Sequence, residues 1–206
     1  MKTRISLDAA AFLCAAALAS ANASAVSIDF ETLADGAAVT NQFTGAGLTF
    51  SNATSLKAGF SLNELDFPPH SGSVVVSDDG GPMTLLFSSP VTQVSAFFTY
   101  AMPLTLTAWD ALDVALDDST LSLYSTNAAL SGDPGSSPNE FLELVFASGI
   151  SKLTVTGDAG GGSFVLDDLV FTPTAVPIPE PGTAALTAIA LAGLLARRRF
   201  AGFTVA

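Results

Sequence analysis

The chain has 206 residues, of which 49% are hydrophobic and 13% charged, and its formal net charge is -12. This composition excludes a disordered chain, and the negative charge argues against nucleic-acid binding because phosphate backbones repel an acidic protein. The single Cys and single His exclude a disulfide framework, a thiolate zinc cluster and a multi-histidine metal site.

Residues 1–25 have the features of a secretory signal peptide. Lys2 and Arg4 form a basic start, residues 9–19 are an apolar run, and residues 23–25 are small, as a signal peptidase requires. We therefore expect the mature chain to begin at Val26. The alternative is a buried helix of the domain.

Residues 26–174 have the pattern of an all-β fold, in which short apolar runs alternate with turn residues. The pattern predicts an antiparallel β-sandwich of jelly-roll-like type in one domain of ordinary size. The stretch 112–121 is ambiguous, and we interpret it as a hairpin around Asp117 and Asp118. The expected strands are 26–30, 47–52, 73–77, 83–87, 91–100, 104–109, 120–124, 141–146, 152–156 and 164–172.

Enzyme chemistry has little support in this part of the chain. His70 and Ser71 follow Phe67-Pro68-Pro69 and are expected in a loop. A glycan hydrolase needs two carboxylates at catalytic separation, but 17 acidic residues between 26 and 176 give no way to choose a pair. We therefore predict that the protein is not an enzyme.

Trp109 and Asp110 are the candidate sugar-binding residues. Trp109 ends an expected strand and is followed by a polar side chain, and carbohydrate sites often combine an exposed ring with polar groups. The alternative is that Trp109 packs in the core or at a sheet edge.

The last expected strand breaks the alternation of a regular strand. Phe164 and Leu166 have one parity, whereas Leu169 and Phe171 have the other. A bulge at the acidic pair between them, Asp167 and Asp168, would bring both apolar pairs to one face. Adjacent carboxylates attract hard cations such as Ca²⁺, so this bulge is a candidate calcium site. The alternative is a solvated acidic edge that discourages aggregation.

The C-terminal segment 175–206 combines a Pro-rich linker, an apolar stretch and a basic end. The prolines disfavour helix up to Pro181, and residues 183–196 are apolar and short for a bilayer span. The arginines would stay on the cytoplasmic side. The residues that define the segment are Pro179, Glu180, Pro181, Arg197, Arg198 and Arg199.

This tail resembles the PEP-CTERM sorting signal of exported Gram-negative bacterial proteins. The resemblance implies a single transmembrane helix at 183–196, transient anchoring in the inner membrane and processing by an exosortase, a membrane-embedded cysteine protease. It also implies association with exopolysaccharide and biofilm. Residues 200–206 extend beyond the arginines, where family members usually stop sooner. The alternative is an ordinary single-pass anchor.

The ends of the domain resemble those of PEP-CTERM ectodomains and of jelly-roll carbohydrate-binding modules. The similar segments are Asp29-Phe30-Glu31 before the strand at 47–52, and the closing strand at 164–172. In such modules the first and last strands share a structural calcium. The resemblance therefore implies that Glu31 and Asp29 join Asp167 or Asp168 at one Ca²⁺.

Together these features predict an exported protein of the cell surface or extracellular matrix, structural in role and associated with exopolysaccharide. Its expected partners are signal peptidase, an exosortase and exopolysaccharide. The alternatives are a lectin-like carbohydrate-binding module and a secreted glycan hydrolase. With Lys57 and Lys152 against 17 acidic residues, the segment 26–176 has a net charge of -15, which favours solubility and repels other polyanions.

Overall fold

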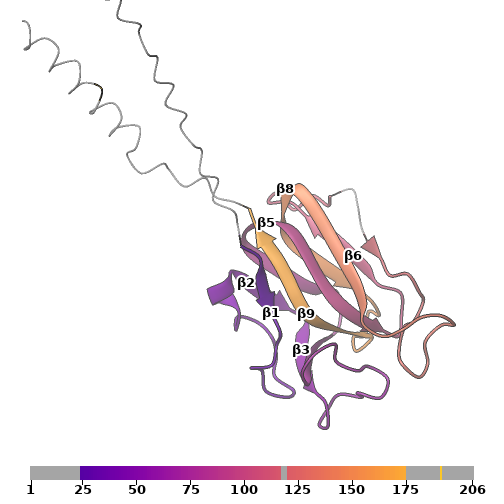
Figure 1. Cartoon of the computed structure of the whole chain (residues 1–206). Coiled ribbons are helices and arrows are strands. Elements are labelled where there is room, and N and C mark those ends of the chain that lie inside the picture. The colour runs from indigo at the N-terminus through magenta and orange to yellow at the C-terminus, as the bar shows by residue number, and fades with distance from the viewer. Residues whose placement is uncertain (1–23, 117–119, 175–190, 192–206) are drawn as a thin grey trace, which may run out of the picture. The chain divides into compact units, whose positions relative to one another are not determined.

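The computed structural model describes residues 24–116, 120–174 and Leu191 (Figure 1). Residues Ala23–Thr174 form one compact unit. The predicted signal peptide at 1–25 lies outside the described residues except for its last two, and so does the tail at 175–206 except for Leu191, which is helical. Among the residues that are described, no helix is long and apolar enough to span a membrane.

The described unit is built from antiparallel strands with one short 3₁₀ turn, η1, at Thr44–Ala46. This architecture confirms the all-β antiparallel prediction. The strands are β1 (Val26–Ile28), β2 (Leu48–Ser51), β3 (Ala53–Lys57), β4 (Val74–Asp78), β5 (Met83–Tyr100), β6 (Thr105–Trp109), β7 (Thr120–Leu121), β8 (Glu140–Thr156) and β9 (Phe164–Pro173).

Two strands are long enough to take part in both layers of the fold. The first half of β5 pairs with β2 and with the second half of β8, which in turn pairs with β6. The second half of β5 pairs with the first half of β8 and with β9. On its other side β9 pairs with β1 near one end and with β4 near the other, and β3 completes that layer.

The bend in these two strands lies where Pro90 faces Gly149. The pairing of β5 with β8 shifts in register between Leu86 and Gln93, and Gly149 has a φ of 94°. A Cβ atom at position 149 would lie 2.9 Å from the Cβ of Pro90. Glycine therefore allows the close approach and the backbone angle that turn the sheet from one layer into the other.

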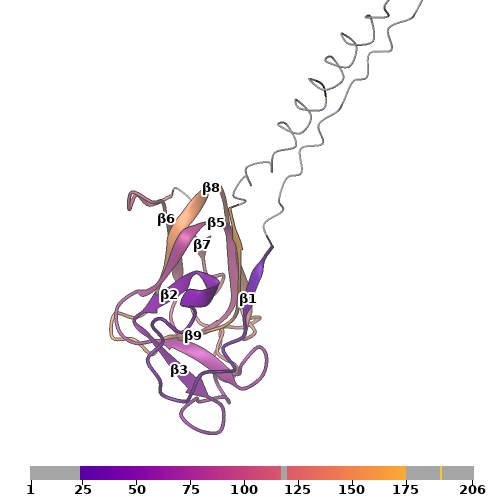
Figure 2. The same ribbon diagram turned by 90° about the vertical axis from the view of Figure 1, so that its left-hand side faces the viewer.

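One hydrophobic core lies between the layers. Alternate residues of each strand point into it, as period two requires: Met83 and Leu85 on β5, for example, and Leu153 and Val155 on β8. Leu142 and Leu144 of β8 likewise lie two positions apart and are both buried in this core. Figure 2 shows β6 on one side of the unit and β1 on the other.

A second, smaller cluster lies on the outer side of β4 and β9. The segment between β3 and β4 folds back over this side and buries Leu62 against Val75 and Val165, with Phe67 packed beside them. Because this segment covers the sheet, it also brings residues 70–74 close to the middle of β9.

The observed strands differ from the expected ones in three places. The runs at 83–87 and 91–100 form the single strand β5, and those at 141–146 and 152–156 form β8, because both continue through the bend. Strand β3 was not predicted, since only one polar residue, Asn52, separates it from β2. Strand β7 pairs with β6, and the predicted turn at Asp117 and Asp118 lies outside the described residues.

Candidate functional site

The predicted bulge in β9 is present. Ser95 of β5 lies opposite Val170, whereas Phe97 lies opposite Asp167, so β9 has one residue more than its partner between these pairs. Asp168 adopts a left-handed conformation with a φ of 47°, which Asp tolerates better than most residues. The extra residue is the physical cause of the broken alternation in the sequence.

The bulge brings both apolar pairs of β9 into the same core. Phe164, Leu166, Leu169 and Phe171 are each 0–1% exposed and belong to one cluster. Without the extra residue, the last two would point to the outer face. The sequence prediction for this strand is therefore confirmed in its structural part.

Backbone N–H groups surround the carboxylate of Asp167. One oxygen accepts hydrogen bonds from the N–H groups of His70 at 2.8 Å and Ser71 at 3.0 Å. The other accepts from the N–H of Asp168 at 2.8 Å. The side chain is 1% exposed, and burial raises the pKa of Asp167 to about 6, with the charge of Asp168 adding to the rise and the N–H donors opposing it.

Asp168 holds the loop that contains His70. Its carboxylate lies 2.6 Å from Nδ1 of His70 and accepts the hydroxyl of Ser71 at 2.9 Å. His70 is thus in a loop, as predicted. The three side chains do not form a nucleophilic triad, because Ser71 and His70 both contact the carboxylate and a triad requires the hydroxyl on the other imidazole nitrogen.

Glu31 and Asp29 lie near the start of the domain and have separate partners. The carboxylate of Glu31 accepts the N–H groups of Ser73 and Val74, both at 2.8 Å. Asp29 is exposed and accepts the N–H of Glu31 at 3.2 Å. Glu31 therefore holds Ser73 and Val74, where β4 begins. These residues closely follow the part of the loop that Asp167 holds.

The structure does not gather these four acidic residues into one group, so it gives no support to the predicted calcium site. Within residues 24–116 and 120–174, no three His, Cys, Asp or Glu side chains are grouped so as to hold a metal ion. The oxygens of Glu31 and Asp167 already accept two or three N–H groups each.

The outer side of the β8–β5–β9 layer carries a group of rings, which we name the phenylalanine face (His70, Phe97 and Phe141). The His70 ring is parallel to that of Phe97, with centroids 3.5 Å apart and planes 7° apart. Phe141 lies opposite Phe97 and is 52% exposed. Sequence analysis did not single out this face, although the inward parity of Leu142 and Leu144 implies that Phe141 points outward.

The outer side of the other layer contains Trp109 in a row of four side chains, one from each of four neighbouring strands. Leu86 of β5 lies opposite Thr49 of β2 and opposite Lys152 of β8, and Lys152 lies opposite Trp109 of β6. Neighbouring strands are about 4.8 Å apart, so the row spans about 14 Å. We name this surface the tryptophan face.

A second row of hydroxyl side chains runs beside the first on the tryptophan face. Cross-strand pairing aligns all of them, one from each of the same four strands. The row comprises Ser51, Thr84, Thr154 and Thr107. Aromatic, aliphatic and hydroxyl groups thus share one outward surface.

Two contacts fix the Trp109 ring on this surface. Its indole N–H donates to the hydroxyl of Thr154 at 3.0 Å, and Nζ of Lys152 lies 4.5 Å from the ring centroid. Lys152 also pairs with Asp113 at 2.5 Å. Trp109 is only partly buried, so it lies on the outer face of the sheet rather than in the core.

Asp110, the other candidate sugar-binding residue, has a structural role next to this ring. Its carboxylate accepts the N–H groups of Leu112 at 2.8 Å and Val114 at 2.9 Å. It thereby closes the turn that follows β6. Asp110 follows Trp109 in the chain, but the carboxylate oxygen of Asp110 is hydrogen-bonded within the loop.

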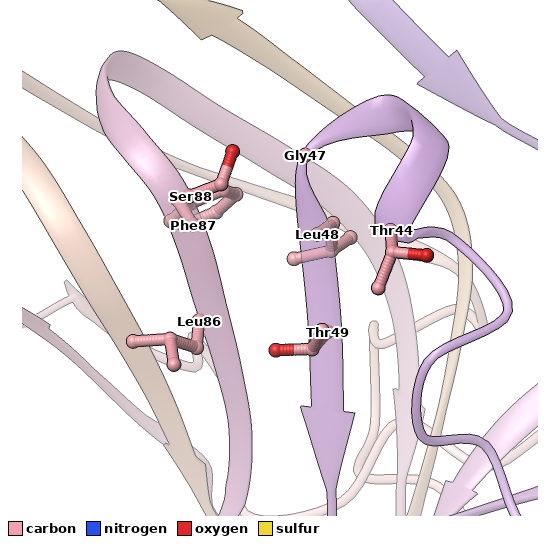
Figure 3. Close-up of a pocket in the computed structure, with 7 residues that line it drawn as sticks. All are labelled: Thr44, Gly47, Leu48, Thr49, Leu86, Phe87 and Ser88. Atoms are coloured by element: carbon pink, nitrogen blue, oxygen red, sulfur yellow. The ribbon is translucent and has the colours of Figure 1, made fainter.

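A hollow of about 230 Å³ lies at the far end of the tryptophan face from Trp109. Thr49 and Leu86, which belong to the cross-strand row, form part of its wall, together with Thr44 of η1 and Ser88 (Figure 3). Its lining residues are apolar or hydroxyl-bearing and include no titratable side chain. This composition suits uncharged ligands rather than acid–base chemistry.

No protein-family model and no curated protein matches the chain. Among solved structures it is similar to the K2 cleaved adhesin domain of Lys-gingipain, with 17% identity, a TM-score of 0.46 and coverage of 72% of this chain and 99% of that one. The K1 adhesin domain from Porphyromonas gingivalis W83 has 11% identity, a TM-score of 0.42 and coverage of 73% and 99%. A family 29 carbohydrate-binding module has 12% identity, a TM-score of 0.39 and coverage of 78% and 99%.

Chelation is expected to leave the stability of the folded domain unchanged. Since N–H groups satisfy the oxygens of Glu31 and Asp167, a thermal melt should have the same midpoint in 1 mM CaCl₂ and in excess EGTA. A bound ion would stabilise the folded state by mass action, so a midpoint that falls on chelation would contradict this assignment. The Glu31→Gln variant, melted under both conditions, serves as the control.

The titration of Asp167 predicts the pH dependence of stability. Its pKa of about 6 in the folded protein lies above the ordinary value of 3.8 for an aspartate carboxyl. The folded state therefore binds the extra proton, and the free energy of unfolding falls as pH rises from about 4 to about 6, by ~3 kcal/mol for two pKa units. Urea unfolding should show that the stability of the wild type falls relative to that of Asp167→Asn across this window, because Asn does not titrate. Parallel pH profiles would contradict the prediction.

Proposed function

We propose that this chain is an exported module of the cell surface or extracellular matrix that binds neutral polysaccharide across its tryptophan face. The observation that carries the proposal is the register of four strands, which aligns Trp109, Lys152, Leu86 and Thr49 in one row beside a row of hydroxyls. This surface includes the candidate sugar-binding Trp109 of the sequence analysis and extends it from one ring to a strip.

The chemistry of the strip matches that of a sugar chain. A pyranose ring has a C–H face that packs on an aromatic or aliphatic side chain, and hydroxyls at its rim that exchange hydrogen bonds with other hydroxyls. Trp109 and Leu86, which is 51% exposed, offer the apolar contacts, and Thr84 and Thr107 offer the polar ones. Binding sites of this kind combine large apolar surfaces with a few oriented polar groups.

The rigidity of the strip favours binding. The Trp109 ring is held by Thr154 and Lys152, and the strands that carry the row are paired on both sides from β5 to β8. A preorganised surface loses little conformational entropy when a ligand binds. The charge of the segment 26–176, -15, repels polyanions and so favours neutral chains.

Export and sorting by an exosortase are the second part of the proposal, and the sequence supports it. Such substrates have a signal peptide at the start and a sorting tail at the end. Residues 1–25 have the basic start, apolar run and small residues of the first, and the C-terminal segment has the Pro-Glu-Pro motif and three arginines of the second. An exported polysaccharide-binding domain, transiently anchored in the inner membrane and then released to the surface, fits association with exopolysaccharide.

Removal of the Trp109 ring is expected to weaken polysaccharide binding at least about tenfold, since aromatic residues that anchor a binding site often contribute about 2 kcal/mol or more. The measurement is retardation of the full chain in native gels that contain hydroxyethylcellulose, xyloglucan or galactomannan, with alginate as the polyanion that should not bind. Trp109→Ala should migrate faster in the gels that retard the wild type.

The matched control for this experiment is Phe60→Ala, because Phe60 is 75% exposed and lies in a loop far from β6 in the sequence. It should bind as the wild type does, and thermal melts should show that both variants are folded. Equal retardation of Trp109→Ala and the wild type would overturn the site. A wild type that no neutral polysaccharide retards would overturn the proposed function.

Sorting is tested at the C-terminus of the protein isolated from its host. In a strain with the exosortase, mass spectrometry should find a chain that ends before the arginines at 197–199. In a strain without it, the same tail should be intact and the protein should stay with the inner membrane. An intact tail in both strains would exclude processing of this chain by the enzyme.

A further inference from the structure

The phenylalanine face lies on the layer opposite to the tryptophan face. Phe97 and Phe141 belong to the second half of β5 and the first half of β8, whereas the tryptophan face uses the other halves of the same strands. Both sets of side chains point away from the one core that lies between the layers. Because the strands pass through the bend at Pro90 and Gly149, the two faces look outward in different directions.

The rings of the phenylalanine face form a fixed platform. His70 stacks on Phe97 at 3.5 Å and is held from the side by Asp168, at 2.6 Å from its Nδ1. Asp168 in turn is positioned by the bulge of β9. Phe141 extends the platform at 5.3 Å from Phe97 and is half exposed. The platform therefore keeps its shape without a ligand.

Polar groups flank this platform on the same side of the sheet. Gln93 lies four positions before Phe97 on β5, and its amide donates a hydrogen bond to the carboxylate of Glu143. Val145, 63% exposed, lies opposite Gln93. The apolar side chains are thus separated by polar ones rather than joined in one apolar patch.

We propose that the phenylalanine face is a second binding surface for neutral polysaccharide, so that one domain binds two chains and crosslinks them. This inference rests on the proposed function of the tryptophan face. It assigns to the matrix protein a mechanical role, because a domain with two outward sites joins separate polymer chains without the need to oligomerise.

The composition of the face favours a sugar chain over other occupants. Large contiguous apolar patches mark protein-docking surfaces, whereas here Gln93 and Glu143 lie between the exposed Phe141 and Val145. A second copy of the chain would bring two domains of charge -15 together and would be opposed by repulsion. Rings beside amide and carboxylate groups are instead suited to the alternating apolar and polar surface of a neutral pyranose.

Two sites on one rigid body also change how the protein acts on a polymer. When one face is bound, the second face remains near other polysaccharide chains of the same matrix. The effective concentration of polysaccharide around the second face is therefore high. Weak sites then give strong retention. A network forms when the number of protein domains is comparable to the number of binding sites on the polymer. Excess protein dissolves the network, because each site on the polymer is then occupied by a separate domain that is bound through one face only.

The experiment compares binding and crosslinking by the same full-chain proteins. Retardation in native gels with hydroxyethylcellulose, xyloglucan and galactomannan measures binding. The viscosity of each polysaccharide solution, measured against added protein, measures crosslinking. The wild type should raise the viscosity to a maximum at intermediate protein and lower it again in excess. Phe141→Ala and Trp109→Ala should each bind through the remaining face only, so both should be retarded less than the wild type and should abolish that maximum. Phe60→Ala should behave as the wild type.

The outcomes separate the second site from the proposed function. Binding by the wild type with an unchanged viscosity maximum in Phe141→Ala would overturn the second site and leave the first intact. Light scattering should give the same monomer mass for the wild type and Phe141→Ala, and loss of a dimer in the variant would show that this face joins copies of the chain, which also overturns the proposal. A wild type that binds none of the three polysaccharides would overturn both.

Discussion

The extra residue in β9 is the constraint on which the rest of the domain depends. It reverses the parity of the strand, so that Phe164 and Leu166 before it and Leu169 and Phe171 after it all enter one core. It also turns Asp167 and Asp168 toward the loop at 70–74, which they hold by N–H groups, a hydroxyl and an imidazole. One backbone irregularity thereby joins the closing strand, the core and the His70 platform.

Most acidic side chains of the domain fasten loops by accepting backbone N–H groups. Asp78 accepts from Ser163 and Phe164, and burial raises the pKa of its carboxyl. Asp133 accepts from the N–H groups of Ser125 and Thr126. An acidic composition therefore has a structural use here, since each such bond satisfies a donor that strand pairing leaves over. This use accounts for many carboxylates in a domain whose described residues include no group of three that could hold a metal ion.

The bend of β5 and β8 decides where the outward side chains lie. Each strand contributes to both layers, so Leu86 and Phe97 of one strand belong to different faces. A straight strand would place its outward residues on one surface. The proposed bivalence is thus a consequence of the same bend that allows one core to be enclosed by a continuous antiparallel sheet.

The sequence alone determined the all-β class, most strand positions and the bulge at Asp167, because period-two alternation and turn residues are local signals. It also indicated that the tail resembles a sorting signal, because that resemblance depends only on the order of residues in the chain. Only the tertiary structure showed that N–H groups of a distant loop donate to the carboxylates of Glu31 and Asp167. It also showed that the apolar runs on either side of Pro90 and of Gly149 join into single long strands, and that Trp109 lies in one row with Thr49. Such contacts join residues up to about a hundred positions apart, and no local pattern specifies which distant groups meet.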